Sequence, residues 1–318
     1  MTLVIAVLAV FGASVGAAHA NPRYAAIVMH ADTGDVLFSR HADAARYPAS
    51  ITKVMTLYML FEALEAGEVE LTDTFTVSKR AAGQPPSKLG VRRGEQLPVE
   101  TAIYALVVRS ANDVATVVAE GLAGSEYKFA KKMTSKARAL GMKRTTFQNA
   151  SGLPHKYQRT TARDLATLSM RMAQDFPDMY HYFGAKSFPY RGKTYRTHNR
   201  VLLNYKGADG LKTGYTRASG FNLATTARKG ENRLIGVVMG GKSSYSRDNH
   251  MRQILDKSFA RLGRSPSLLR RAYVARPKPR MKPTLLASGE TVETPVIATL
   301  FTPDLSPKRK QALAILDP

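Results

Sequence analysis

The chain has 318 residues and no cysteine, and its 47 lysines and arginines outnumber its 24 aspartates and glutamates. The absence of cysteine excludes disulfides, thiolate metal ligands and cysteine nucleophiles. An apolar fraction of 44% permits a substantial core, enough for one catalytic domain and short extra segments. The basic excess favours anionic partners such as acidic lipid or wall polymers, although a solvated basic surface would give the same balance.

The first twenty residues predict an export signal peptide that is cleaved after Ala20. They carry no charged side chain, contain an apolar stretch of about ten residues and end in Ala18-His19-Ala20. That stretch is well short of the roughly twenty residues that a membrane span needs. The usual Lys or Arg near Met1 is missing, so the true translation start can lie upstream. Export argues against nucleic acid as a partner, and no motif for reading or stacking bases is visible.

Next in the chain come a β-hairpin and three helices. Two short apolar runs in residues 24–40, separated by a turn that contains Gly34, predict the hairpin. A helix buried on most faces is expected from Ser50 to about Gly67. A second buried helix is expected after Asn112, and a third from about Ser125 to Leu140, closed by a glycine.

The later part of the chain predicts a second hairpin and a last helix. Apolar runs at 221–227 and 234–239 flank a polar turn, and helical spacing returns from Ser246 to Leu262. A hairpin at each end can pair into one antiparallel sheet covered by helices, so the predicted class is α+β with a helical subdomain. We expect the catalytic domain to span residues 21–263.

Residues 264–318 differ in composition from the rest of the chain. Eight of the sixteen prolines fall here, mixed with basic clusters such as the one at 276–283. This pattern favours a basic, extended or disordered tail, which is where an anionic membrane or wall polymer could bind. Leu285 and residues 292–301 could still form a strand or two, so a small added module stays possible.

Ser50 and Lys53 place a hydroxyl and an amine on one face of the first turn of a buried helix. In a semi-buried, positively charged environment the pKa of a lysine falls, so its neutral amine can take the proton of the serine hydroxyl. The backbone N–H groups at the start of the helix can stabilise a developing oxyanion. The pair alone is a weak signal, because about one Ser-x-x-Lys is expected by chance in this length. The simpler interpretation is a capping serine beside a surface lysine.

Two further motifs complete a possible site. Ser110 and Asn112 could relay a proton and hold the substrate's peptide group, or could simply start a helix. In the segment Lys212-Thr213-Gly214, which we expect to open a strand, the lysine and threonine could anchor a substrate carboxylate. The glycine would then let the substrate lie along the strand. The backbone N–H of the next residue, Tyr215, could complete an oxyanion hole with that of Ser50.

This ordered set is the one known from penicillin-binding proteins and serine β-lactamases. From about Asn21 to Leu262 the chain resembles the low-molecular-mass penicillin-binding D-alanyl-D-alanine carboxypeptidases, peptidase family S11. The resemblance rests on five stretches in one order: 48–56, 109–113, 140–153, 161–166 and 209–216.

The resemblance implies a mechanism and a further site residue. Ser50 would be acylated by a stem peptide of peptidoglycan that ends in D-Ala-D-Ala, the last D-Ala would leave, and water would release the rest. β-Lactams would acylate the same serine, and no cofactor is needed. Arg247 falls where the family carries a basic residue that meets the terminal carboxylate, although a solvated arginine at a helix start is an equal alternative. The β-rich second domain and amphipathic anchor of many relatives are not evident, so membrane attachment stays open.

Three other functions use similar motifs or fit the same composition. A class A β-lactamase needs a glutamate that activates the deacylating water, and no Glu-x-x-Leu-Asn segment occurs. A D,D-endopeptidase that cuts crosslinks uses the same motifs and stays open. A catalytically silent wall-binding scaffold is disfavoured by the intact motifs. No metal site is expected, because the seven histidines are scattered, and His198 is expected in a loop or at a strand edge.

Overall fold

The computed structural model describes residues 21–263. The expected signal peptide, 1–20, and the expected tail, 264–318, lie outside the described residues. The elements in chain order are β1 (Ala25–His30), β2 (Val36–Arg40), the 3₁₀ turn η1 (Ala49–Ile51), α1 (Thr52–Glu65), β3 (Thr74–Thr76), α2 (Lys79–Ala82), β4 (Gln96–Pro98), α3 (Val99–Tyr104), the π-helical turn η2 (Ala105–Arg109), α4 (Asn112–Ala123), α5 (Glu126–Ala139), α6 (Ala162–Asp175), the 3₁₀ turn η3 (Tyr180–Gly184), β5 (Ser187–Tyr190), β6 (Lys193–Arg196), α7 (Arg200–Asn204), β7 (Ala208–Thr216), β8 (Gly220–Lys229), β9 (Asn232–Gly241) and α8 (Ser244–Gly263).

A five-stranded antiparallel sheet joins the two ends of this domain in the order β2-β1-β9-β8-β7. The two predicted hairpins pair through β1 and β9, as expected, because both strands carry a long apolar run that is buried between the two helical layers. Strand β7 is the last in this order and has no strand neighbour on its outer side. The α+β class predicted from the sequence is confirmed.

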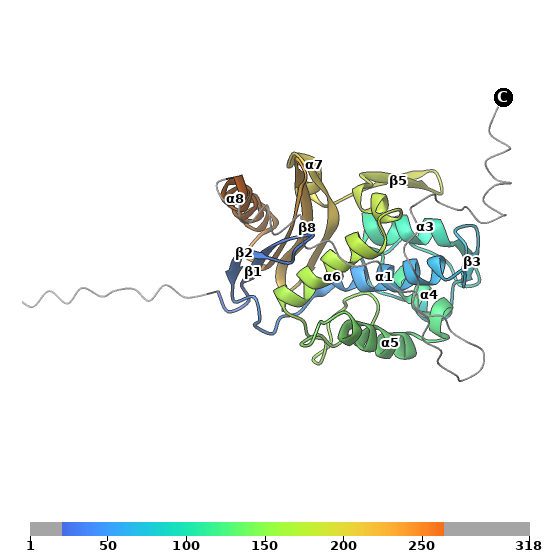
Figure 1. The fold of residues 1–318 in the computed structure, drawn as a ribbon. Coiled ribbons are helices and arrows are strands. Elements are labelled where there is room, and N and C mark those ends of the chain that lie inside the picture. The colour runs from blue at the N-terminus through green and yellow to red at the C-terminus, as the bar shows by residue number, and fades with distance from the viewer. Residues whose placement is uncertain (1–20, 264–318) are drawn as a thin grey trace, which may run out of the picture. The chain divides into compact units, whose positions relative to one another are not determined.

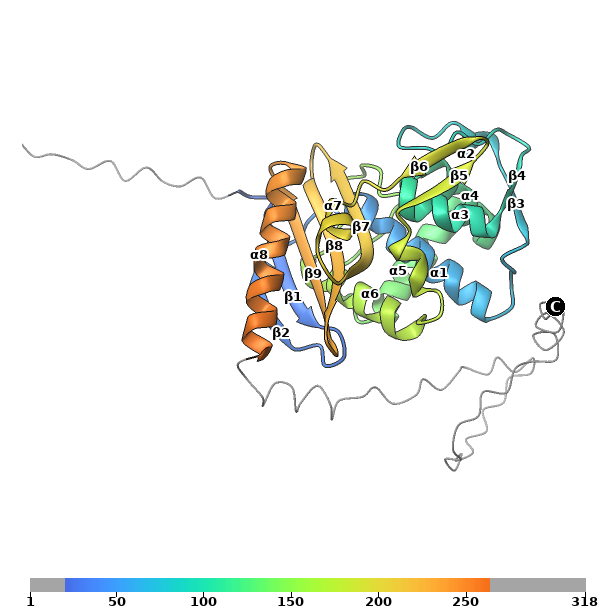
Figure 2. The ribbon, with the colours of Figure 1, turned by 90° about the horizontal axis from the view of Figure 1, so that it is seen from above.

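Helices cover both faces of the sheet (Figures 1 and 2). Alternate residues of β1 divide between two cores: Ile27 packs toward α1 and α6, whereas Val28 packs toward α8. The helix α8 lies so close to β9 that a Cβ added at Gly236 would stand 2.5 Å from the sulfur of Met251. The sheet is therefore fixed between two packed layers, and this holds its edge strand in place.

The helical subdomain continues from the inner face of the sheet (Figure 2). Its centre is α1, and ten of the fourteen residues of this helix are buried. A helix apolar on nearly every side must pack on all sides, and α4, α5 and α6 contact it. Among residues 21–263, none of the helices is both long and apolar enough to span a membrane.

The structure corrects one expected boundary. Lys212 was predicted to open a strand, but β7 begins at Ala208, so the lysine lies well inside the strand. The short pairs β3–β4 and β5–β6, the helix α6 and the π-helical turn η2 were not predicted as elements. The first four residues of the π turn are buried, and the turn ends at Arg109 and Ser110, which are partly exposed.

Candidate active site

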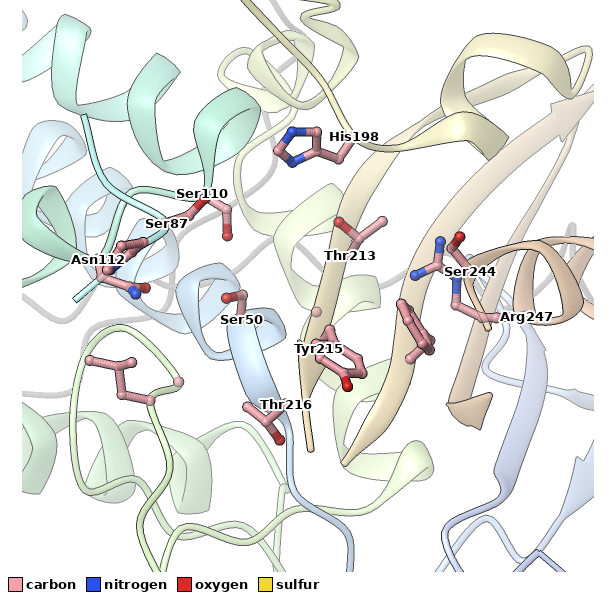
Figure 3. A pocket seen from close by; sticks show the side chains of 15 residues that line it. Ser50, Ser87, Ser110, Asn112, His198, Thr213, Tyr215, Thr216, Ser244 and Arg247 are labelled. Carbon is pink, nitrogen blue, oxygen red and sulfur yellow. The ribbon is translucent and has the colours of Figure 1, made fainter. Parts of the chain in front are cut away.

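A cleft of about 390 Å³ lies between the edge strand β7, the start of α1 and the loop before α4 (Figure 3). Ser50, Ser110, Asn112, Thr213, Gly214, Tyr215 and Arg247 all line it. Lys53 and Lys212 are buried next to it, with 0% and 3% of their surfaces exposed. The structure thus brings every site residue predicted from the sequence into one region.

The start of α1 presents Ser50 to the cleft in a constrained backbone. Ala49, just before the serine, has a positive φ of 50°, which is uncommon for a residue other than glycine. Its carbonyl packs directly against Gly152, where an added Cβ would lie 1.9 Å from that oxygen. The serine therefore stands at a tightly held turn before the helix.

The amine of Lys53 is held by three oxygen atoms. Its Nζ lies 3.2 Å from Ser50 Oγ, 2.8 Å from Asn112 Oδ1 and 2.5 Å from the carbonyl oxygen of Ser151. The other end of the Asn112 amide, Nδ2, donates to the Pro85 carbonyl at 2.9 Å, so its oxygen faces the lysine. A neutral amine has two N–H donors for the two carbonyl acceptors, and its lone pair then faces the serine hydroxyl.

The surroundings of Lys53 favour that neutral form. Burial lowers the pKa of Lys53 well below its ordinary value, and the positive charge of Lys212 lowers it further. The carboxylates of Asp113 and Glu126 act in the opposite direction and do not overcome these two effects. An uncharged amine beside a serine hydroxyl is a general base in position to take its proton.

On the sheet side of the cleft, Lys212 and Arg247 form a positive region. Burial and the nearby Arg247 lower the pKa of Lys212 to about 7. The guanidinium of Arg247 bonds Asp248 and donates to the Asn222 carbonyl at 3.0 Å, which ties the start of α8 to β8. Thr213 projects into the cleft between this region and Ser50 (Figure 3), a place that suits a substrate carboxylate.

Strand β7 passes unusually close to the serine. A Cβ added at Gly214 would lie 2.9 Å from the backbone nitrogen of Ser50, so only glycine fits without displacement. This approach sets the backbone of Tyr215 beside that of Ser50, where two N–H groups can face one carbonyl oxygen. The Tyr215 ring itself is 56% exposed and packs on Phe221.

Two site residues have contacts different from those expected. Ser110 lines the cleft with a left-handed backbone, φ 59°, and does not hydrogen-bond Lys53 among the described contacts. Asn112 uses its amide oxygen on Lys53 rather than leaving it for a substrate. Their roles as proton relay and peptide anchor stay predictions, and the geometry adds a role for Asn112 in positioning the lysine.

Sequence reasoning missed part of the cleft. The Ser151 carbonyl, Gly152 and Leu153 belong to a stretch noted only for its family likeness, and a backbone carbonyl leaves no mark on residue type. His198 was expected in a loop; it lies in one, at the rim of the cleft. Within the described part of the chain, no cluster of His, Cys, Asp or Glu could hold a metal ion.

Comparison with known proteins finds D-alanyl-D-alanine carboxypeptidases. D-alanyl-D-alanine carboxypeptidase DacF of Bacillus subtilis is 30% identical over 297 residues, which are 92% of this chain and 76% of the relative. DacA of Escherichia coli K12 is 35% identical over 240 residues, 73% of this chain and 60% of that protein.

Solved structures give the same result. Penicillin-binding protein 5 of Haemophilus influenzae matches with a TM-score of 0.72 at 30% identity, covering 74% of this chain and 70% of that one. Penicillin-binding protein D2 of Listeria monocytogenes, solved in an ampicillin-bound form, matches with a TM-score of 0.68 at 28% identity and covers 74% and 96%. The D-alanyl-D-alanine carboxypeptidase family, peptidase S11, matches residues 14–243, and the chain belongs to this family.

Proposed function

We propose that this protein is a serine-type D-alanyl-D-alanine carboxypeptidase that removes the last D-Ala from peptidoglycan stem peptides and is acylated by β-lactams. The observation that carries the proposal is the 3.2 Å contact between the Ser50 hydroxyl and a buried lysine amine of lowered pKa. Membership of the D-alanyl-D-alanine carboxypeptidase family and the likeness to an ampicillin-bound relative support the same activity.

The first chemical step is the acylation of Ser50. Lys53 takes the hydroxyl proton as the serine oxygen attacks the carbonyl carbon of the penultimate D-Ala. The backbone N–H groups of Ser50 and Tyr215 stabilise the negative oxygen that develops. The C–N bond then breaks, the proton passes to the leaving nitrogen, directly or through Ser110, and free D-Ala departs. In the second step, water hydrolyses the ester on Ser50, which releases the shortened peptide and restores the free serine.

The substrate's terminal carboxylate is placed by the sheet side of the cleft. Thr213 and the positive charges of Lys212 and Arg247 receive it, and the binding of an anion favours the charged form of Lys212. The peptide backbone lies along the outer edge of β7, which has no strand neighbour there. Recognition of a free carboxylate next to the scissile bond makes the enzyme a carboxypeptidase.

The location of the protein follows from its substrate. Peptidoglycan lies outside the cytoplasmic membrane, so we place the enzyme in the periplasm or another extracytoplasmic compartment, delivered by a signal peptide in residues 1–20. The basic segment 264–318 is proposed to associate with an anionic membrane or wall polymer.

The test combines two assays on the purified protein. Fluorescent penicillin should label the chain covalently, and a pentapeptide ending in D-Ala-D-Ala should release free D-Ala. The Ser50→Ala variant should lose both activities while keeping its thermal unfolding temperature. A folded wild-type protein that shows neither activity would overturn the proposal in favour of a catalytically silent wall-binding protein.

A further inference from the structure

Glu126, the first residue of α5, is a carboxylate that is almost fully buried, with 4% of its surface exposed. Its Oε2 accepts hydrogen bonds from Arg80 Nε at 3.2 Å and Nη2 at 2.7 Å, and its Oε1 accepts the backbone N–H of Ala150 at 3.2 Å. A buried carboxylate has lost its hydration, and the Arg80 side chain is 64% exposed, so this ion pair is a weak source of stability. The bond to Ala150 is the contact that leads to the catalytic centre.

The bond to Ala150 belongs to a short segment that also holds Lys53. The Ala150 carbonyl accepts a hydrogen bond from Thr56 Oγ1 at 2.7 Å, and the next carbonyl, that of Ser151, accepts one from Lys53 Nζ at 2.5 Å. Thr56 and Lys53 are three residues apart on α1, so they lie on the same face of that helix. The bond to Thr56 fixes one point of the segment, and the bond to Glu126 adds a second point on α5. Two points fix the direction of the segment and therefore the position of the Ser151 carbonyl.

The position of the Ser151 carbonyl decides which way the lone pair of the Lys53 amine points. A neutral amine has two N–H donors, and here they go to Ser151 and to Asn112 Oδ1, which leaves the lone pair for the Ser50 hydroxyl. If the Ser151 carbonyl moved away, the amine could turn and donate an N–H to Ser50 Oγ instead. An amine that donates to the serine cannot take its proton, so the reaction needs this carbonyl in place.

The charge of Glu126 acts on the same amine. Of the charged groups that face Lys53, Lys212 on β7 lowers its pKa, whereas the carboxylates of Asp113 on α4 and Glu126 on α5 raise it. Burial of the amine outweighs these charges. Removing the charge of Glu126 would therefore lower the pKa of Lys53 further, and this effect can be measured separately from the loss of a hydrogen bond.

We propose that Glu126 is a positioning residue for the general base: its carboxylate holds the Ala150 N–H, and through it the Ser151 carbonyl, where that carbonyl directs the lone pair of Lys53 at Ser50. Its negative charge also contributes to the pH at which the amine becomes neutral. Glu126 acts through Ser151 and takes part in no bond that forms or breaks. This inference rests on the proposed function and deepens it.

The test compares three variants of the full chain with wild type. Glu126→Ala removes the acceptor of the Ala150 N–H, whereas Glu126→Gln keeps an oxygen for it and removes the charge. Glu62→Ala is the matched control, because Glu62 of α1 pairs with Lys136 of α5 at 2.7 Å, the same distance as Arg80 to Glu126. Stopped-flow acylation by a fluorescent penicillin gives the acylation rate constant, the dissociation constant of the first complex and their pH dependence. Circular dichroism checks that each variant is folded.

Glu126→Ala should lower the acylation rate constant at high pH by roughly 10- to 100-fold, because the amine is no longer aimed at Ser50. The dissociation constant should stay within about 2-fold, since the groups that receive the substrate carboxylate lie on β7 and α8. Glu126→Gln should recover the rate constant to within about 3-fold of wild type and move the acidic limb of its pH profile to lower pH. Glu62→Ala should keep the rate constant and the pH profile of wild type.

The inference fails if folded Glu126→Ala is acylated as fast as Glu62→Ala, or if Glu126→Gln is as slow as Glu126→Ala. A role of Glu126 in folding alone would lower the amount of folded protein and leave the acidic limb of Glu126→Gln unmoved, and this result would also contradict the inference. Acylation of wild type and its release of D-Ala are measured in the same series. If wild type shows both, the carboxypeptidase function stands whatever the variants do.

Discussion

Two buried lysines in one cleft have opposite surroundings. Lys53, on the helical side, is held by three oxygen atoms within 3.2 Å. Lys212, on the edge strand, hydrogen-bonds only the neighbouring Thr213 carbonyl among the described contacts and faces the positive Arg247. Burial lowers the pKa of both. The difference lies in what each amine can do next: Lys53 is positioned to accept a proton from Ser50, and Lys212 is positioned to gain an anion.

This contrast explains how two lysine amines in one cleft can have different roles, Lys53 as the base and Lys212 as the carboxylate-binding group. The positive charge at Lys212 helps to keep Lys53 neutral, and a bound carboxylate would stabilise the charge on Lys212. The substrate carboxylate would therefore supply the negative partner that Lys212 lacks, whereas Lys53 already has its oxygen partners within the protein.

The largest effect is expected from removing the base. Lys53→Met keeps the apolar stem but has no lone pair for the serine proton, so penicillin acylation should slow by about 10²–10⁴-fold. Stopped-flow or mass-spectrometric acylation rates measure this. Lys212→Met should instead weaken the binding of carboxylate substrates and leave most of the serine's reactivity. Equal losses of acylation with an uncharged ester substrate in both variants would contradict the division of roles.

Asn112→Asp should make Lys53 behave like a charged lysine. The new carboxylate would lie about where Oδ1 now stands, 2.8 Å from the amine, and its negative charge would raise the pKa of Lys53. The acidic limb of the acylation pH profile should move to higher pH, with near-normal rates once the amine is deprotonated. An unchanged profile would show that this amine is not the base.

Gly214→Ala tests the contact between the two sides of the cleft. The added methyl would meet the backbone of Ser50 and force β7 and the start of α1 apart, so acylation should fall by about 10-fold or more because the oxyanion donors separate. Circular dichroism of the purified variant should confirm that it is folded. Unchanged acylation kinetics would contradict the close approach of β7 to the serine.

The smallest effect concerns stability. The pKa of Lys212 is about 7 in the folded protein and near 10.5 when exposed, so the unfolded state binds more protons between these values. The free energy of unfolding should therefore rise with pH across that window, by at most about 1.4 kcal/mol per pH unit for this group. Lys212→Met should flatten the slope in urea titrations at pH 7, 8 and 9, and exposed Lys131→Met should not. If the free energy of unfolding depended on pH equally in both variants, Lys212 would be solvent-exposed, contrary to this account.

Much of the fold was predictable because its signals are local. The two apolar hairpins, the all-round apolar helix α1 and the last helix α8 each follow from the spacing of side chains along the chain. The short pairs β3–β4 and β5–β6 were missed, since three or four residues give too short a pattern to separate strand from loop.

The site was predictable in its residue types and less so in its contacts. Ser50, Lys53 and Lys212 stand in motifs whose order is informative, and the structure brings them together. The Ser151 carbonyl that holds Lys53 could not be predicted, because every residue has the same backbone carbonyl. The inward turn of the Asn112 amide oxygen depends on the distant Pro85 carbonyl, a contact that no sequence spacing indicates.

The charge state of Lys53 in the free enzyme tests the central claim most directly. The protein can be prepared with lysine labelled at the side-chain nitrogen and carbon, and the Lys53 signal can be assigned by its loss in Lys53→Met. An NMR titration should show this amine losing its proton at a pH well below that at which an exposed lysine such as Lys131 loses its own. A signal that stays that of an ammonium group up to pH 9 would contradict the mechanism.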